Sequence, residues 1–537
     1  MKTKTAKFGP YVLLGGIFLI LAALNIFRHD QWLDSDMAAE MIFSRLLGES
    51  GHIFATADWY YSTEFRFLYT QLVMAPLFFL TDNWHIIRGI TNVVFYILML
   101  AAYFYMMKPL GIKREVTILT GSVLLLPFSE TMMTHMQMGN TYMSHVILLY
   151  FYFGIYLRLA GQGARSRRGR RILAGVYAAL GVICGVSGVR YLLAMQCPLV
   201  LTAMIYLASS TEFQTFRKQF GADKETKKRF MQIGKSERAP YFFYGILGAA
   251  CSLAGYGVNV LWVSRHYVFQ TYGATNFIAV YQGVLGERVQ NALGSLLMLF
   301  GYIPDKGFLS LRGVVTMLSF VMAGLFVYCV VRGLKRDRGR RYFVSLFLTV
   351  SFAVNVFVFC FTTSTMVPRY YITLLMFALP VLAFYLEGDD PVFDRMTVGL
   401  LLGFCLCAAS VKVTASYLTV DKNADRRGAA AFLEENGYNF GFATYWNANI
   451  ITELTDGRVE VANLWEPAGG EYFKWSSPMK YYEEDYGSGE IFLLLTGEEE
   501  ALCRETGVLR GGEAVYDDGK YMVYVFADRE TWRSYCS

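Results

Sequence analysis

Cysteine is scarce in this sequence and follows no spacing typical of a disulfide framework or a metal site. Seven of the nine cysteines in 537 residues lie in apolar stretches, where a thiol behaves as a small hydrophobic group. The other two, Cys503 and Cys536, lie in the polar C-terminal segment and can pair if that segment is outside the cell. The pattern excludes a disulfide-rich fold and gives no support for zinc.

Charge is also sparse, because charged residues make up 17% of the chain and hydrophobic residues 55%, with a mean hydropathy of +0.34. Long apolar runs alternate with basic clusters, as in a polytopic membrane protein. The first run, 11–27, follows a lysine-containing start and lacks a small-residue cleavage site, so we expect a retained signal anchor. We therefore expect a multi-pass protein of the cell membrane, and the composition favours a bacterial plasma membrane.

Positive charge is concentrated in three segments, which are 158–171, 218–238 and 332–341. The first holds six arginines and no acidic residue. By the positive-inside rule these loops face the cytoplasm. They orient helices, and nucleic-acid binding is not expected.

Residues 1–420 are expected to form a mostly α transmembrane bundle of about 11 to 13 helices. The predicted spans are 11–27, 85–107, 115–130, 143–158, 172–187, 189–208, 241–263, 312–331, 342–361, 370–386 and 396–416. The apolar pieces 67–81 and 291–303 are about 20 Å long as helices, shorter than the roughly 30 Å hydrocarbon core. We expect both to be re-entrant or interfacial, which leaves open whether either one spans.

Residues 421–537 carry 22 acidic against 11 basic side chains and are expected to form a small extracytoplasmic α/β domain. A helix is expected at 429–435 and strands at 440–445, 459–464, 491–496 and 521–526, with Asp-Gly turns between some of them. The segment is rich in aromatic residues that can stack on sugar rings or fill the core. They are Trp446, Trp465, Tyr472, Trp475, Tyr481 and Tyr482.

The first outer loop, 28–65, is dense in acidic and aromatic groups, which include Asp34, Asp36, Glu40, Asp58 and Tyr60. Its acidic motif Asp34-Ser35-Asp36 begins about seven residues past the first apolar run. Paired carboxylates in such a place are candidates for catalysis. The alternative is structural, because Asp34 or Ser35 can cap a helix over 37–47.

Arginines stand at or near the predicted outer ends of helices, at Arg190, Arg265 and Arg369, the last followed by Tyr370. A charge at the rim of a membrane segment is a functional candidate, and the guanidinium fork suits bidentate binding of phosphate. The alternative for each is that it snorkels to lipid headgroups or anchors a helix end.

This layout resembles the GT-C superfamily of integral-membrane glycosyltransferases. The resemblance rests on Asp34-Ser35-Asp36 after the first helix, the many further helices, Arg369-Tyr370 before a late helix, and the C-terminal domain. It implies a polyprenyl-phosphate-linked sugar as donor and transfer outside the cytoplasm. The sequence lacks the Lys-Pro-Pro-Leu-like stretch of the aminoarabinose and protein mannosyl transferases. Residues 64–68 occupy that place, with Arg66 as the phosphate-binding equivalent.

The resemblance assigns roles to these candidates. Asp36 or Asp34 acts as general base toward the acceptor, while Arg369, Arg190 and Arg66 or Arg265 stabilise the leaving polyprenyl phosphate. Direct displacement with inversion is the simpler mechanism. The acidic pair can instead hold a divalent metal, for which hard oxygens favour Mg or Mn. Glu40, Asp58, Tyr60 and Tyr370 are further candidates for substrate binding.

Other functional classes stay open. A transporter, a lipid flippase or a polysaccharide polymerase would also show many helices and outer charge, and a receptor could bind a partner through the acidic domain. No internal repeat is visible, and the charged groups gather at the outer rim, which favours an enzyme. The sequence does not identify the sugar or the acceptor, which can be a glycan, a lipid or a protein, and it leaves the oligomeric state open.

Overall fold

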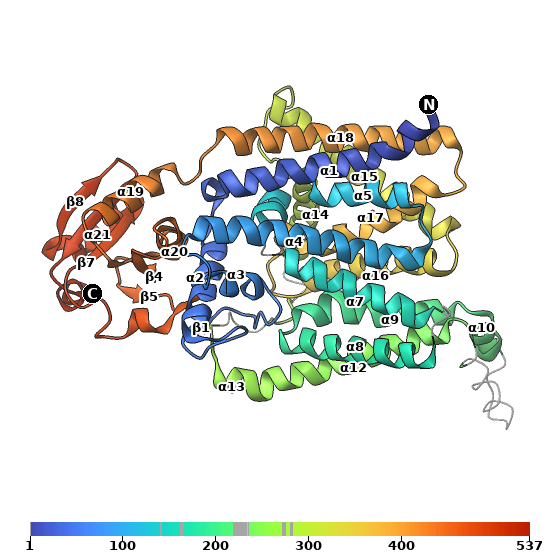
Figure 1. Ribbon diagram of the computed structural model, residues 1–537, viewed down its shortest axis with the longest axis horizontal. Helices are drawn as coiled ribbons and strands as arrows, with labels where there is room; N and C mark the ends of the chain where they lie inside the picture. The colour runs from blue at the N-terminus through green and yellow to red at the C-terminus, as the bar shows by residue number, and fades with distance from the viewer. Residues whose placement is uncertain are drawn as a thin grey trace.

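Long helices run side by side in one bundle, and the C-terminal residues form a lobe at one end of it (Figure 1). The computed structural model describes residues 2–139, 142–161, 166–218, 234, 236–270, 275–279 and 283–536. Within these residues, nine helices are long and apolar enough to cross a membrane, and the bent pair Arg114–Leu125 and Glu130–Met138 raises the number to ten if it is one span. With the shorter apolar helix Leu192–Ala208, these account for all eleven predicted spans. The chain is a multi-pass membrane protein.

In the part of the chain that the structure describes, eleven helices of the bundle correspond to the predicted spans. They are α1 (Lys2–Arg28), α4 (Trp84–Met107), α5 (Arg114–Leu125), α7 (Met143–Ala160), α8 (Arg167–Val186), α9 (Cys197–Ala208), α12 (Ala239–Val258), α15 (Leu311–Arg336), α16 (Gly339–Phe361), α17 (Ile372–Glu387) and α18 (Val392–Thr419). The interior between them is rich in tyrosine. Tyr150 and Tyr156 are fully buried. The Tyr150 hydroxyl donates to the carbonyl of Met376 at 2.7 Å, and the Tyr156 hydroxyl donates to the carbonyl of Tyr241 at 2.8 Å. Each hydroxyl therefore has a hydrogen-bond partner although no water reaches it.

Short elements interrupt or join these helices. They are α6 (Glu130–Met132), α10 (Thr211–Lys218) and α13 (Ser264–His266), the π-helical turns η3 (Met133–Met138), η4 (Leu192–Gln196) and η5 (Asn259–Val263), and the 3-10 turns η1 (His29–Trp32), η2 (Lys108–Leu110) and η7 (Pro368–Tyr371). The predicted span at 115–130 is not straight, because α5 ends at Leu125 and the chain bends by 90°. Pro127 accounts for the end, since a residue that precedes proline avoids the helical region.

The two apolar pieces of uncertain depth form short helices. Segment 67–81 contains α3 (Gln71–Leu77), of seven residues, and 291–303 falls mostly within α14 (Leu285–Leu299), of fifteen. At 1.5 Å per residue these helices are about 10 and 22 Å long, which is less than a bilayer core. Neither is among the helices that could cross a membrane in the described part of the chain.

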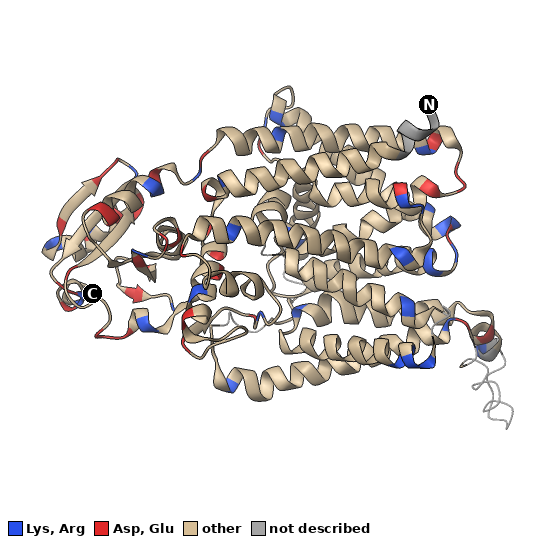
Figure 2. Cartoon of the chain, in the orientation of Figure 1, with Lys and Arg blue, Asp and Glu red and all other residues tan. Residues whose placement is uncertain are grey.

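Lysine and arginine are concentrated in the loops at the end of the bundle far from the lobe, near the N-terminus (Figure 2). The described residues of the predicted basic clusters 158–171 and 332–341 belong to this end. Most of the third cluster, 218–238, lies outside the described residues. The charge asymmetry therefore separates the two ends of the bundle.

The lobe is a mixed sheet with helices on its faces. Its six strands follow the order β5-β4-β3-β7-β9-β8, in which β3 is parallel to β4 and β7 and the other pairs are antiparallel. The strands are β3 (Phe440–Thr444), β4 (Glu460–Glu466), β5 (Glu471–Tyr472), β7 (Ile491–Thr496), β8 (Glu513–Asp517) and β9 (Tyr521–Phe526). The other elements are α19 (Ala424–Glu435), α20 (Tyr445–Leu454), α21 (Gly497–Thr506), α22 (Arg529–Ser534), η8 (Met479–Tyr482) and η9 (Val508–Gly511).

The four strands predicted in this lobe correspond to β3, β4, β7 and β9, and the predicted helix is part of α19. Strands β5 and β8 escaped prediction because they are short or exposed and lack a run of apolar residues. Cys503 and Cys536 are both free thiols, so the structure does not contain the disulfide that they could form.

The first loop lies between the bundle and the lobe. It contains α2 (Ser35–Ser50), which packs on α20, and β1 (Trp59–Tyr61). Strand β1 pairs in parallel with β2 (Val268–Phe269) and antiparallel with β6 (Ser477–Pro478) of the lobe. Three segments that are far apart in the sequence thus meet in one small sheet.

Candidate active site

A cavity of about 570 Å³ lies where α2 and the segment after it meet the lobe. Its wall combines charged residues from the first loop and the helix ends with aromatic residues from the lobe. The lining includes Asp36, Glu40, Glu64, Arg66, Arg190, Arg369, Tyr370, Tyr445, Trp446, Trp465 and Trp475. Six of the ten predicted site residues are among them. The cavity therefore joins chemical groups that are up to about 440 positions apart in the sequence.

The two aspartates of the acidic motif have different surroundings. Asp34 is the N-cap of α2, where its Oδ1 accepts a hydrogen bond from the backbone N–H of Met37 at 2.9 Å. Burial, and then the neighbouring Asp36 carboxylate, raise the pKa of Asp34 to about 6. The capping interpretation of the sequence therefore describes the geometry of Asp34, which does not line the cavity.

Asp36 lies in the first turn of α2 and lines the cavity. Its Oδ1 accepts a hydrogen bond from the Tyr445 hydroxyl at 2.7 Å, and its Oδ2 is 3.7 Å from Nη1 of Arg369. Burial, together with the Asp36 carboxylate, raises the pKa of Tyr445 well above its ordinary value, so the hydroxyl keeps its proton and acts as donor. One carboxylate oxygen is thus held by the lobe while the other faces a cation.

Glu40 lies one turn further along α2 and holds Arg66. Its Oε1 accepts from Nη1 of Arg66 at 2.8 Å, and its Oε2 accepts from the Thr70 hydroxyl at 3.0 Å. Burial raises the pKa of Glu40 to about 7, and the Arg66 guanidinium opposes this shift only in part. The guanidinium also stacks over the Tyr69 ring, with 4.7 Å to its centroid. Glu40 therefore holds the Arg66 guanidinium in place by a hydrogen-bonded ion pair.

Arg190 is held by Glu64. Its Nε forms an ion pair with Glu64 Oε1, and Nε2 of His145 lies 3.7 Å from Glu64 Oε2. Burial alone would raise the pKa of Glu64, but the charge of Arg190, together with His145, lowers it to about 2. Arg190 also lies 5.9 Å from the ring centroid of Tyr370. Glu64 stands in the segment where the sequence departs from the aminoarabinose and protein mannosyl transferase pattern.

Three sequence candidates lie elsewhere. Arg265 is exposed in α13 and does not line the cavity. Asp58 is exposed and accepts a hydrogen bond from the Thr56 hydroxyl at 2.8 Å, and Tyr60 packs edge-on against Tyr482 at 5.5 Å. The structure therefore does not bring these side chains to the cavity with Asp36.

Sequence reasoning did not single out Tyr445, because nothing marks it locally as different from the other tyrosines of the lobe. Three of the six aromatic residues proposed there to stack on sugars, Trp446, Trp465 and Trp475, line the cavity. The other three do not line it, and Tyr481 is fully buried. Tyr481 is thus part of the core, while stacking on a sugar stays a prediction for the three tryptophans of the cavity.

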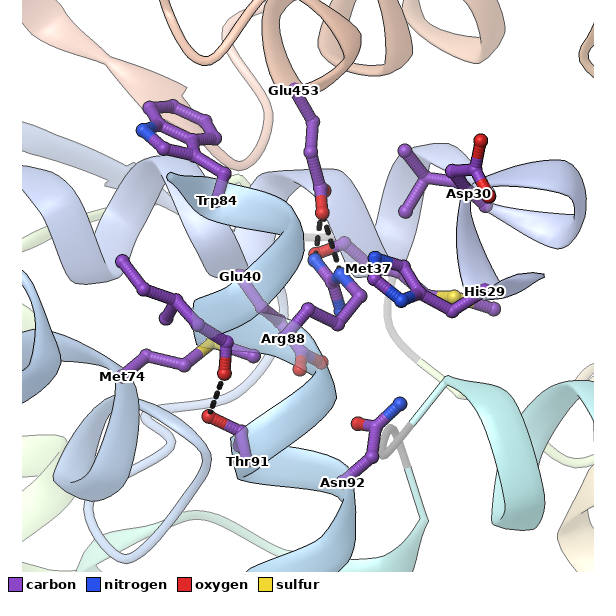
Figure 3. Close-up of polar contacts among 12 residues, drawn as sticks. His29, Asp30, Met37, Glu40, Met74, Trp84, Arg88, Thr91, Asn92 and Glu453 are labelled. Atoms are coloured by element: carbon purple, nitrogen blue, oxygen red, sulfur yellow. Dashed lines mark hydrogen bonds and ion pairs between the residues drawn. The ribbon is translucent and has the colours of Figure 1, made fainter. Parts of the chain in front are cut away.

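A buried ion pair connects the site to the bundle (Figure 3). Arg88 of α4 is 0% exposed, and Nε and Nη2 of its guanidinium donate to the two carboxylate oxygens of Glu453 in α20, at 2.5 and 2.7 Å. Nη2 also donates to the Met37 carbonyl at 2.9 Å. The Arg88 side chain therefore joins α4 to α2 and α20, the two helices that carry Asp36 and Tyr445.

The arrangement of the acidic pair does not fit a metal site. In the part of the chain that the structure describes, no group of three or more His, Cys, Asp or Glu side chains is placed to hold a metal ion. Asp34 is engaged by the backbone of α2, while Asp36 is held by a phenol and faces a guanidinium. A divalent ion would meet one available carboxylate beside a positive charge, which is unfavourable.

Comparison with known proteins adds evidence about the fold. No family model matches the chain, and its sequence matches no curated protein. Among solved structures, apo ArnT from Cupriavidus metallidurans is similar over 98% of this chain and 99% of that chain, with a TM-score of 0.53 and 12% identity. For ArnT bound to undecaprenyl phosphate, the TM-score is 0.49 and the identity 13%, over 96% of this chain and 98% of that chain. For the oligosaccharyltransferase of Archaeoglobus fulgidus, the TM-score is 0.43 and the identity 12%, over 95% of this chain and 72% of that chain. The chain therefore shares the fold of ArnT, in agreement with the helical bundle and C-terminal domain that its sequence predicted.

Proposed function

We propose that this protein is a membrane glycosyltransferase that takes a sugar from a polyprenyl-phosphate donor and passes it to an acceptor at the lobe end of the bundle. The observation that carries the proposal is the cavity in which the Asp36 carboxylate lies beside a series of guanidinium groups. A carboxylate suits removal of a proton from an acceptor, and guanidinium groups suit a leaving phosphate. The GT-C fold supports this pairing of roles.

The topology that we propose places the lobe outside the cytoplasm. The lysines and arginines are concentrated at the opposite end of the bundle, which the positive-inside rule assigns to the cytoplasm (Figure 2). The cavity then opens at the outer face of the membrane. A donor whose isoprenoid chain lies among the helices can present its phosphate there.

Asp36 is the proposed general base. As an acceptor hydroxyl attacks the anomeric carbon, its proton passes to Asp36, and the bond from that carbon to the phosphate oxygen breaks with its electron pair on the phosphate. Tyr445 holds the carboxylate through the hydrogen bond to Oδ1, which leaves Oδ2, 3.7 Å from Nη1 of Arg369, to accept the proton. Attack from the face opposite the phosphate inverts the configuration at the anomeric carbon.

Arg369 is the proposed main phosphate ligand. Arg66 donates to Glu40 at 2.8 Å and Arg190 forms a close ion pair with Glu64, so both guanidinium groups already serve a carboxylate. Arg369 reaches Asp36 at 3.7 Å, which is too long for a hydrogen bond, and 36% of its side chain is exposed. It therefore has the most donors available for a phosphate, and Arg190 and Arg66 add longer-range stabilisation.

The test is transfer of radiolabelled sugar from a panel of polyprenyl-phosphate sugars by the purified protein in detergent. We expect turnover by the wild type and a loss of about 10²- to 10⁴-fold in Asp36→Asn, the usual range for a general base. Asp82→Asn, an exposed change near the start of α4, is the matched control and should keep turnover. Wild-type activity that survives Asp36→Asn would refute the role of Asp36. Absence of turnover with every donor would favour a transporter or flippase.

A further inference from the structure

The cavity has two ends of different chemistry. The bundle end carries Arg190, Arg369 and Tyr370, while the lobe end is lined by Trp446, Trp465, Phe473 and Trp475. Asp36 and Tyr445 lie where the two ends meet, joined by their hydrogen bond of 2.7 Å. The proposed function uses the charged end and leaves the aromatic end without a role.

The aromatic wall is a connected assembly. Phe473 is at its centre, edge-on to Tyr445 at 5.6 Å, tilted against Trp465 at 4.9 Å, and parallel to Trp475 at 5.6 Å and 5°. Trp446 packs edge-on to Tyr445 at 5.2 Å. These contacts hold the rings in fixed orientations, so that a ligand would meet a preformed surface.

Two of these rings are unusually exposed for tryptophan. Trp446 is 60% exposed and Trp465 is 59% exposed, whereas Trp84 and Trp532 are almost fully buried. Large exposed apolar surface that is bordered by polar groups marks a binding site. Ser62, Thr63 and Ser476 line the same cavity and supply hydroxyl groups. Ser476 has a positive φ of 46°, a conformation that is uncommon for a residue with a side chain and is found at ligand sites.

We infer that this aromatic wall binds a sugar ring of the acceptor, so that the acceptor is a saccharide or a molecule that carries one. This inference rests on the proposed function, in which a sugar is transferred to an acceptor, and it adds the chemical class of that acceptor. A pyranose presents an apolar C–H face to an indole and hydroxyl groups at its edge, which matches rings surrounded by serine and threonine. The ring would then hold a hydroxyl near Asp36.

An isoprenoid chain is a poorer occupant of this wall. The wall belongs to α20, β4 and the residues before β6, all of which lie in the lobe beyond the ends of the helices (Figure 1). A lipid chain would have to leave the bundle to reach it. The sugar of the donor could also occupy the aromatic wall. Kinetic measurements distinguish the donor sugar from the acceptor sugar.

The experiment has a binding arm and a kinetic arm on the full chain in detergent. In the first, calorimetry without donor measures binding of maltotetraose, cellotetraose, mannotetraose and chitotetraose. We expect at least one to bind the wild type and to bind about tenfold more weakly to Trp446→Ala and to Trp465→Ala. Trp262→Ala, which removes a tryptophan that is 50% exposed outside the cavity, is the matched control and should not change the affinity. Failure of all four saccharides to bind, or equal binding by both wall variants, would overturn the inference.

The kinetic arm separates the two sugars and the two proposals. In transfer assays with a saccharide acceptor, the wall variants should raise KM for the acceptor about tenfold and leave KM for the donor unchanged. A rise in KM for the donor alone would assign the wall to the donor and overturn the inference. Transfer with unchanged acceptor KM would overturn the inference but keep the glycosyltransferase. Tetrasaccharide binding that depends on the wall, in a protein that transfers from no donor, would refute the glycosyltransferase and keep the saccharide as the wall's ligand.

Discussion

Arg88 and Glu453 form a two-pronged ion pair between a membrane helix and the lobe, 365 positions apart in the sequence. Arg88 is 0% exposed and Glu453 6%. The same guanidinium donates to the carbonyl of Met37, the residue after Asp36. Because Glu453 belongs to the helix that begins with Tyr445, this pair supports both partners of the Asp36–Tyr445 hydrogen bond.

Removing one member of the Arg88–Glu453 pair should destabilise the protein strongly. Arg88→Met or Glu453→Met leaves the other group buried without its partner, which typically costs about 3–5 kcal/mol. The measurement is the apparent free energy of unfolding in detergent. The double variant Arg88→Met/Glu453→Met serves as control and should lose less than the sum of the single losses, because no charge is left unpaired. Single variants as stable as the wild type would contradict the assigned role of the pair.

Sequence reasoning recovered the elements more completely than the site. Apolar runs and strand-like stretches carry local signals, so spans such as 85–107 and strands such as 491–496 could be placed. The partners of Asp36 come from residues 369 and 445, and only the fold brings them together. The sequence also could not show whether Asp34 or Ser35 would cap α2, because each side chain carries an oxygen that suits a helix N-terminus.

The capping role of Asp34 predicts that stability depends on the hydrogen-bonding oxygen of its side chain more than on its negative charge. Asp34→Asn keeps a side-chain oxygen for the Met37 N–H, so we expect stability close to that of the wild type and turnover within a few-fold. Asp34→Ala removes the cap and should cost about 0.5–2 kcal/mol. Thermal unfolding and sugar transfer check both variants. A loss of turnover in Asp34→Asn as large as that in Asp36→Asn would instead make Asp34 a catalytic group.

Arg369 and Arg265 provide a direct comparison of two arginines that the sequence treats alike. Arg369 lines the cavity 3.7 Å from Asp36, whereas Arg265 is exposed outside it. We expect Arg369→Ala to lower kcat/KM for the donor by about 10²- to 10³-fold, as does loss of one donor to a developing anion. Arg265→Ala should stay near wild type. Equal losses in the two variants would mean that Arg265 reaches the substrate in solution.

The raised pKa of Glu40 should make the stability of the protein depend on pH. The free energy of unfolding should fall as the pH rises between the pKa of Glu40 in the unfolded chain and its pKa in the folded protein. Burial raises the pKa of Glu40 from an ordinary value of 4.5 to about 7. Between these values the folded state binds more protons than the unfolded state, so the free energy of unfolding falls with pH, by up to ~3 kcal/mol in total.

Glu40→Gln removes this titration and should flatten the dependence of the apparent unfolding temperature on pH. Part of the slope should remain, because burial and Asp36 raise the pKa of Asp34 to about 6, which acts in the same direction. The measurement is thermal unfolding of wild type and Glu40→Gln over the pH range between the two pKa values and above it. Parallel curves for the two proteins would show that Glu40 is already ionised throughout, and that its ion pair with Arg66 outweighs the effect of burial.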